Sequence, residues 1–295
     1  MKYTNKYFLP KQIINACMED DGHNPVNNVY HVTELIKPCK ASVLERRHWN
    51  DIEIDASDCV WLVFGKAVHE VLQYGNMSHF MQAEKYIERE IGDEYGTKIV
   101  GRMDLYDPRW KTVVDWKTAT VTKVLKGDYS EYRRQGLEYA WILKAYGKTV
   151  SKLKFTMFLK DWSKGQKRLA AIQGRPYPES AINVWEYTIT DSDMEEIDQW
   201  IRERVATIKR YETMADNDIP VCSEEERWAS PTLYAVMKQG RKSAVKICST
   251  AEEAQALIDT DAEHLYLEVR PGVSRRCEDY CPVAQFCNWK ERTQN

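Results

Sequence analysis

Two short apolar runs, separated by an Asp-Pro turn signal, carry charges where buried strands would have none. The runs are "TKIVGRMDLY" at 97–106 and "KTVVDWKTA" at 111–119, and together they predict an antiparallel hairpin. Asp104 lies in the first run, and Asp115 and Lys117 lie in the second. Because burying unpaired charge is costly, this cluster indicates a partner, an ion or a catalytic role.

Strand geometry should bring the three charges together. Alternate residues of a strand share a face, so Asp115 and Lys117 project from the same side and the neighbouring strand can present Asp104 to them. Two carboxylates can hold Mg²⁺ or Mn²⁺ against a phosphate, and a lysine can orient water or stabilise developing charge. The set suits phosphodiester hydrolysis, and the alternative is an ordinary surface ion pair between Asp115 and Lys117.

The residues upstream predict a helix followed by a strand. Helical spacing of apolar residues over 58–75 predicts a buried helix that carries His69, and the alternation over 83–91 predicts a strand ahead of the hairpin. The apolar positions of the helix are Trp61, Phe64, Val68, Val71 and Leu72. The strand offers further carboxylates, ranked below the first two acids, at Glu84, Glu88 and Glu90.

The residues downstream return the chain to the sheet. An amphipathic helix is predicted over 130–147, closed by Gly147, with Gln135 and Tyr139 one turn apart. A strand follows at 152–162. Since strands and helices interleave in this way, we expect an α/β fold.

The last part of the core is predicted to be a strand and a long helix, and the C-terminal segment a small separate module. A strand at 184–190 precedes a helix at 192–214, where Ser192 and Glu195 match a capping box. Its apolar stripe is Met194, Ile197, Ile201, Val205 and Ile208. Beyond it, residues 232–272 predict a small module of hairpin, helix and strand.

The hairpin and its flanking helices resemble the PD-(D/E)XK nuclease superfamily, in which one acid is followed on the next strand by D/E-x-K, here Asp104 and then 115–117. They are similar to its RecB-like branch, because a G-x-x-x-H element ends at His69 and a Q-x-x-x-Y element spans 135–139. The resemblance implies a restriction-endonuclease-like core, a central mixed sheet flanked by helices, with a small C-terminal Cys-cluster module.

The resemblance also implies a role for each residue. Asp104 and Asp115 would be metal ligands, and the backbone carbonyl of Trp116 would complete the inner shell. Lys117 would serve the nucleophilic water. His69 would be a further metal ligand or positioner, with a core histidine as the alternative. Gln135 and Tyr139 would contact the DNA backbone or brace the site, and the alternative is that they only pack along the helix.

Three of the eight cysteines cluster in "RRCEDYCPVAQFCNWK". A cytosolic chain keeps its thiols reduced, so a disulfide framework is not expected. The C-x3-C-x5-C spacing of Cys277, Cys281 and Cys287 resembles the iron-sulfur site of AddB-type and CRISPR-adaptation nucleases, which implies a [4Fe-4S] cluster, with structural Zn²⁺ as the alternative. The fourth ligand would be Cys222, as in phage-encoded RecB-like nucleases, or Cys39, as in the AddB arrangement.

The chain is long enough for a core domain with a smaller module, and its net charge limits where phosphates can bind. We expect a nuclease core with an N-terminal helical region at 1–219 and a Cys-ligated module at 220–295. A net charge of -3 and a pI near 6.1 predict no general affinity for polyanions, which leaves local basic loops at 160–175 and 238–246 for phosphates. Four tryptophans could stack on unpaired bases: Trp49, Trp110, Trp162 and Trp228.

The expected function is divalent-metal-dependent DNA cleavage, more specifically by an exonuclease acting on single-stranded ends in recombination, repair or phage replication. The alternatives are a structure-specific or restriction-like endonuclease and an inactive nucleic-acid-binding subunit. No apolar run reaches the ~20 residues of a membrane span, so a cytoplasmic protein is expected. The residues do not identify a phage or host recombination partner.

Overall fold

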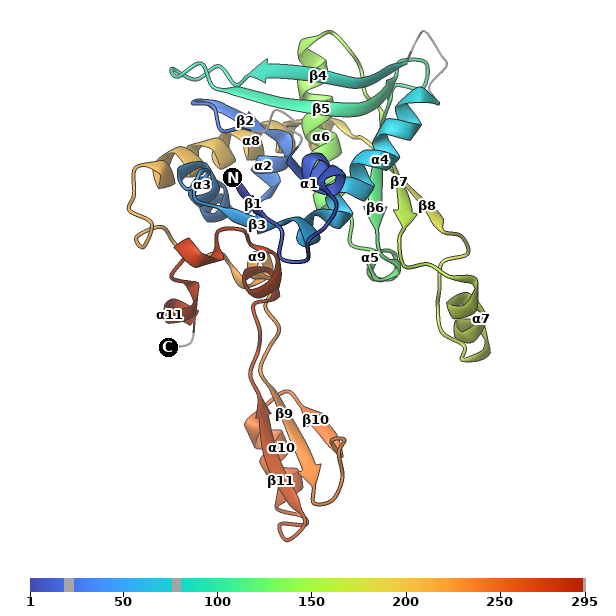
Figure 1. Ribbon diagram of the computed structural model, residues 1–295, viewed down its shortest axis with the longest axis vertical. Coiled ribbons are helices and arrows are strands. Elements are labelled where there is room, and N and C mark those ends of the chain that lie inside the picture. Colours follow the sequence, from blue (N-terminus) through green and yellow to red (C-terminus); the bar gives the residue numbers. More distant parts are fainter. Residues whose placement is uncertain (19–23, 76–80, 294–295) are drawn as a thin grey trace. The chain divides into compact units, whose positions relative to one another are not determined.

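A six-stranded mixed sheet organises the first of two units, Met1–Thr213, in the computed structural model, which describes residues 1–18, 24–75 and 81–293 (Figure 1). The strand order is β2-β5-β6-β7-β8, with β4 also paired to β5. Only the β2–β5 and β6–β7 pairs among these are parallel. The strands are β2 (Val29–His31), β4 (Gln82–Glu90), β5 (Lys98–Asp107), β6 (Thr112–Ala119), β7 (Lys152–Leu159) and β8 (Ile182–Thr188).

Helices flank this sheet, which confirms the expected α/β fold. The long ones are α4 (Val60–Tyr74), α6 (Ser130–Ala145) and α8 (Asp191–Glu212). Helix α6 packs on β4 to β7, and α8 packs on α6. The shorter elements are β1 (Lys2–Thr4), α1 (Lys11–Met18), α2 (Val32–Ile36), α3 (Cys39–Arg47), β3 (Glu53–Asp55), α5 (Val121–Lys126) and α7 (Lys164–Ile172).

The core follows the predicted periodicities. Strand β7 alternates half-buried and buried residues along its length, and α6 is buried continuously from Gln135 to Leu143. Gly147 follows α6 with a φ of 67°, the left-handed conformation that lets glycine end a helix. On α8 the predicted stripe is confirmed as buried at Ile197, Ile201, Val205 and Ile208.

Helix α4 forms as predicted, but the expectation that it is buried is wrong: no residue of α4 is fully buried, and Val71 is 69% exposed. The helix meets the sheet through Gly65, beside Thr118, and through His69. At about 100° per residue this orientation turns Val71 away from the sheet. Periodicity gives the apolar stripe of a helix, but not the direction in which the stripe points.

Two further expectations are corrected. Helix α8 begins at Asp191, one residue before the predicted start, and its capping box is formed by Thr190 and Asp193, because the Thr190 hydroxyl accepts from the backbone N–H of Asp193. Ser192 instead contacts Glu196. The basic segment 160–175, expected to be a loop, contains helix α7 at Lys164–Ile172.

The second unit, Met214–Asn295, contains the predicted hairpin, helix and strand. In its described part, β9 is the centre of a three-stranded antiparallel sheet. Its elements are α9 (Glu224–Arg227), β9 (Leu233–Lys238), β10 (Lys246–Cys248), α10 (Ala251–Ile258), β11 (Leu265–Arg270) and α11 (Trp289–Thr293).

Two chain segments join this small sheet to the cysteine region. The Ser230 N–H donates to the Val273 carbonyl at 2.9 Å, and Gly272 lies so close to the Ser230 carbonyl that a Cβ at 272 would overlap it. The two segments therefore run tightly side by side. No helix in the described ranges has the length and apolar character needed to cross a membrane.

Candidate metal and active site

The site lies where β5 and β6 part. Among the described residues, β5 bonds to β2 only through 98–100 and to β6 only through 105–107. Residues 101–104 of β5 therefore have no strand neighbour on that side. Backbone polar groups at such a gap need other partners, and side chains supply them here.

Those partners are residues that the sequence had singled out. The Asp104 carboxylate accepts from the Trp116 backbone N–H at 2.6 Å, and the Tyr139 hydroxyl donates to the Arg102 carbonyl at 3.0 Å. The Trp116 carbonyl lies 2.8 Å from His69 Nε2. Side chains from α4 and α6 thus complete the hydrogen bonding of the parted strands.

Three carboxylates form a row across three strands. Pairs on both sides of Glu84 place it opposite Asp104, although the two residues do not themselves pair. Continuing the β5–β6 register places Asp115 opposite Asp104 on the other side. Like charges directly opposite one another destabilise a sheet, so this row requires cations.

Glu84 reaches the row through an unusual backbone conformation. Its φ is +47°, a left-handed value that non-glycine residues seldom adopt and that clusters at functional sites. Its two alternatives on β4 lie elsewhere: Glu88 pairs with Lys98 at 2.8 Å, and Glu90 is exposed. Alternation along the strand predicts that Glu84, Glu88 and Glu90 share one face. Only the pairing of β4 with β5 shows that Glu84 is the residue opposite Asp104.

Two basic side chains face the carboxylates. His69 Nδ1 lies 3.4 Å from Asp104 Oδ1 and 3.6 Å from Glu84 Oε1, and Lys117 Nζ lies 2.8 Å from Asp115 Oδ2. Burial alone would lower the pKa of His69, but its interactions with Asp104 and Glu84 outweigh burial and raise that pKa to about 10. In the metal-free protein, a protonated His69 therefore balances part of the carboxylate charge.

Asp115 is the most deeply buried acid of the row, at 2% exposure. Burial raises its pKa to about 7, opposed by Lys117 and reinforced by the charge of Asp104. Asp115 Oδ2 lies against the Lys117 ammonium group, whereas Glu84 Oε1 is a buried oxygen with no hydrogen-bond partner among the described residues. An unpartnered oxygen in a charged site calls for an ion or water.

The donor set fits a hard divalent cation. One ligand atom from each of His69, Glu84 and Asp104 lies within 4.8 Å of the others. Oxygen donors with one imidazole suit Mg²⁺ or Mn²⁺. The expected ligands are His69, Asp104, Asp115 and the Trp116 carbonyl. The trio contains Glu84 in addition to His69 and Asp104, whereas Asp115 lies next to the trio and the Trp116 carbonyl contacts His69.

Gln135 and Tyr139 meet on α6. Gln135 Nε2 lies 3.4 Å from the Tyr139 hydroxyl, and both side chains are buried. The ring of Tyr139 lies so close to Gly101 that a Cβ there would come within 2.8 Å of it, so glycine admits the ring. Burial, with the charges of Asp115 and Asp104, raises the pKa of Tyr139 well above its usual value, and its neutral hydroxyl braces β5.

A second group of residues lies in the other unit. Burial raises the pKa of Cys222 to about 12, with smaller contributions from Glu226 and from the three clustered thiols. The four thiols of this group are Cys222, Cys277, Cys281 and Cys287. Cys39 belongs to the first unit, where it is 5% exposed.

The four tryptophans have different surroundings. Trp110 is 74% exposed in the turn between β5 and β6. Trp162 is half-buried, and its indole N–H donates to the Pro178 carbonyl. Arg276 lies over the ring of Trp228. Trp49 lines a pocket beside α4.

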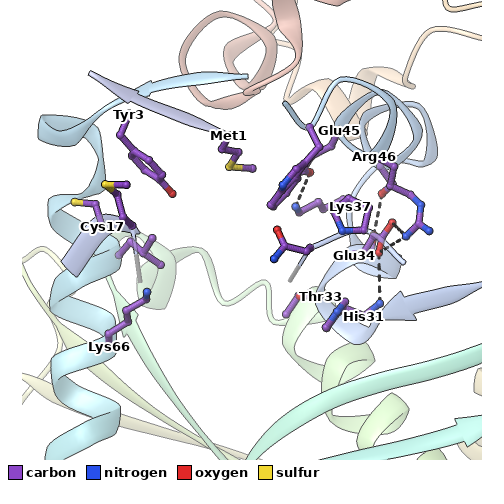
Figure 2. Close-up of a pocket in the computed structure, with 16 residues that line it drawn as sticks. Met1, Tyr3, Cys17, His31, Thr33, Glu34, Lys37, Glu45, Arg46 and Lys66 are labelled. Carbon is purple, nitrogen blue, oxygen red and sulfur yellow. Dashed lines mark hydrogen bonds and ion pairs between the residues drawn. The ribbon is translucent and has the colours of Figure 1, made fainter. Parts of the chain in front are cut away.

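That pocket has a volume of about 440 Å³ (Figure 2). Lys66 points toward it from α4, one turn before His69. On the opposite wall, Lys37 pairs with Glu45 at 2.7 Å, and a second ion pair joins Arg46 to Glu34. The carboxylates of the row do not line this pocket, which is a separate hollow next to the site.

A sequence model described as the PD-(D/E)XK nuclease superfamily matches residues 66–224, more than half of the chain. No curated protein matches significantly. Solved structures, among them the following three, are also similar to the chain. SSO0001 has a TM-score of 0.47 at 18% identity, with 66% of this chain and 83% of that chain covered.

The other two are exonucleases by name. A phage-related exonuclease from Haemophilus somnus 129PT has a TM-score of 0.31 at 16% identity, with 50% of this chain and 68% of that chain covered. LHK-Exo in complex with dAMP has a TM-score of 0.35 at 9% identity, with 61% of this chain and 91% of that chain covered.

Proposed function

Because this chain belongs to the PD-(D/E)XK nuclease superfamily, we propose that it is a divalent-metal-dependent DNA exonuclease of the RecB-like branch, acting on single-stranded ends. The observation that carries the proposal is the row of Glu84, Asp104 and Asp115 at the parting of β5 and β6, faced by His69 and Lys117.

The residues of this row would hold Mg²⁺ or Mn²⁺, and the bound ion would polarise the scissile phosphate and lower the pKa of a water. Asp104 and Asp115 are the first ligands, with Glu84, His69 and the Trp116 carbonyl as the further donors. The unpartnered oxygen of Glu84 supports this assignment.

Lys117 has the role of positioning the nucleophile. Its ammonium group lies next to Asp115, where it can orient a water and stabilise negative charge that develops on the phosphate. Tyr139 acts indirectly, because its hydroxyl fixes the β5 backbone two residues before Asp104, and Gln135 contacts that hydroxyl. Both are positioning residues.

We also propose a [4Fe-4S] cluster held by Cys222, Cys277, Cys281 and Cys287. Four thiolates suit either a [4Fe-4S] cluster or structural zinc, and we favour the cluster because the sequence lacks the paired C-x2-C knuckles that are common in zinc sites. Cys222 as the fourth ligand is supported by its electrostatic interaction with the other three thiols.

The test compares two substrates in the presence of Mg²⁺, Mn²⁺ or EDTA. One is an end-labelled single-stranded oligonucleotide, and the other is a covalently closed single-stranded circle. We expect progressive shortening of the oligonucleotide with either metal, no reaction in EDTA and an intact circle. Cleavage of the circle would identify an endonuclease, and absence of cleavage with both metals would leave a nucleic-acid-binding subunit.

A further inference from the structure

The small sheet of the second unit separates its charges by element. Its cations all lie on the strands or on the β9–β10 loop: Lys238, Arg241, Lys242, Lys246 and Arg270. Five acids lie on α10 or in the turn after it: Glu252, Glu253, Asp259, Asp261 and Glu263. The one acid on the strands, Glu268, is 2.7 Å from Arg270. The hairpin is therefore a local basic surface on a chain whose net charge is negative.

The cations at the hairpin tip have few protein partners. From residue 227 to residue 251 the sequence contains no acid. Arg241 contacts the hydroxyl of Ser243, whereas Lys242 and Lys246 form no ion pair with any described residue. All three are exposed. Their charges are available to an anion outside the protein.

Helix α10 covers one face of the same sheet, where Ala254 and Ile258 pack against Val236. On the opposite, open face, Ile247 and Tyr266 of the two edge strands are 50% and 45% exposed, whereas the β9 residues with which they pair are buried. The basic loop adjoins this face through β10 (Figure 1).

We propose that the β9–β10 hairpin binds the phosphate backbone of duplex DNA through its tip, with Arg241 and Lys242 as the contacting residues. A two-stranded ribbon fits the major groove, and arginine and lysine on loops are usual phosphate contacts. A single strand is a poorer fit, because such sites stack bases on aromatic rings and the 239–245 loop has none. The inference rests on the proposed function in that DNA is the ligand.

The structure offers a matched pair of variants for the test. Arg241→Gln/Lys242→Gln removes two charges from the hairpin tip. Gln255→Glu/Ala256→Glu makes the same change in net charge on the exposed side of α10. Fluorescence anisotropy with full-length protein in EDTA would measure affinity for a 30-base-pair blunt duplex between ~50 and ~200 mM salt. Cleavage of a short single-stranded oligonucleotide in Mg²⁺ is measured separately.

We expect the hairpin variant to bind the duplex about tenfold more weakly, with a slope of log affinity against log salt that is smaller by about 2, because each lost phosphate contact removes about 0.9. The α10 variant should bind like the parent, and both should cleave the short oligonucleotide at the parental rate. Equal loss of affinity in both variants, or parental affinity in the hairpin variant, would overturn the proposal and leave the open face to a protein partner. If neither the parent nor the variants cleave the oligonucleotide, but the hairpin variant still binds the duplex more weakly than the parent, the nuclease proposal fails and the docking proposal stands.

Discussion

Asp115 is a buried charge beside a second carboxylate, which is an arrangement that function explains better than stability. It lies opposite Asp104 in the sheet, and Lys117 lies against one of its oxygens at 2.8 Å. Removing such a charge relieves repulsion between the two carboxylates. The cost of the substitution should therefore appear in catalysis rather than in folding.

We expect Asp115→Asn to lower the cleavage rate at least about 100-fold, because a ligand to the ion is lost. The melting temperature measured in EDTA should not fall. Lys117→Ala should have a comparable effect on the rate, whereas Lys154→Ala, on the neighbouring strand, should have none. Parental cleavage by the first two variants would remove both residues from the active site.

Glu84 provides a second test at the residue scale, with Glu88 as its natural control on the same strand. If Glu84 helps to hold the ion, Glu84→Gln should weaken Mn²⁺ binding about tenfold in titration calorimetry, whereas Glu88→Gln should leave it unchanged, since Glu88 pairs with Lys98. Losses that are equal in the two variants would mean that the strand is perturbed generally and that Glu84 is not a ligand.

At the scale of elements, Asp193 fixes the start of α8. Its carboxylate accepts from the backbone and hydroxyl of Thr190 and from Tyr187, and it pairs with Arg133. Burial opposes ionisation of Asp193, but these contacts outweigh it and lower its pKa to about 2. A folded-state pKa below the unfolded value of 3.8 stabilises the fold above pH ~4, and this contribution is lost as the pH falls toward 2.

We therefore expect Asp193→Asn to reduce the free energy of unfolding by about 1–2 kcal/mol at pH 7. The difference from the parent should shrink as the pH falls from 4 to 2. Urea midpoints at pH 7, 4 and 3 would measure it. Asp191→Asn, an exposed acid in the same helical turn, is the control, and an unchanged difference at pH 3 would contradict the role given to the Asp193 charge.

Elements were more predictable than their orientations. Periodicity was enough for α6, α8 and the charged hairpin, because each carries its pattern within one segment. It did not give the rotation of α4, which depends on how His69 and Gly65 meet β6, nor the place of Glu84, which depends on register with a strand elsewhere in the chain. The convergence of Asp104, Asp115 and Lys117 was predictable because a tight hairpin fixes their register locally.

At the scale of the whole molecule, the region around the cysteines is poor in core. Within the described parts of 214–229 and 274–293, the buried apolar side chains are Ile219, Val283 and Trp289. So small a core does not hold a segment of this length in place without a cross-link or a metal. The same segments form the base of the β9–β11 sheet, so a bound cluster would also anchor the proposed DNA-binding hairpin.

The cluster can be tested with two cysteine variants. Protein purified without oxygen should be brown, absorb broadly near ~400 nm and contain about four irons per chain. Cys222→Ser should bleach the colour and expose residues 274–293 to protease, because one ligand to the cluster is lost, while Cys39→Ser should change neither. The reverse result would assign the fourth ligand to Cys39. A colourless preparation with one zinc per chain would exclude the iron-sulfur cluster and leave the carboxylate row of the nuclease unit unaffected, because the proposed ligands of the two metal sites share no residue.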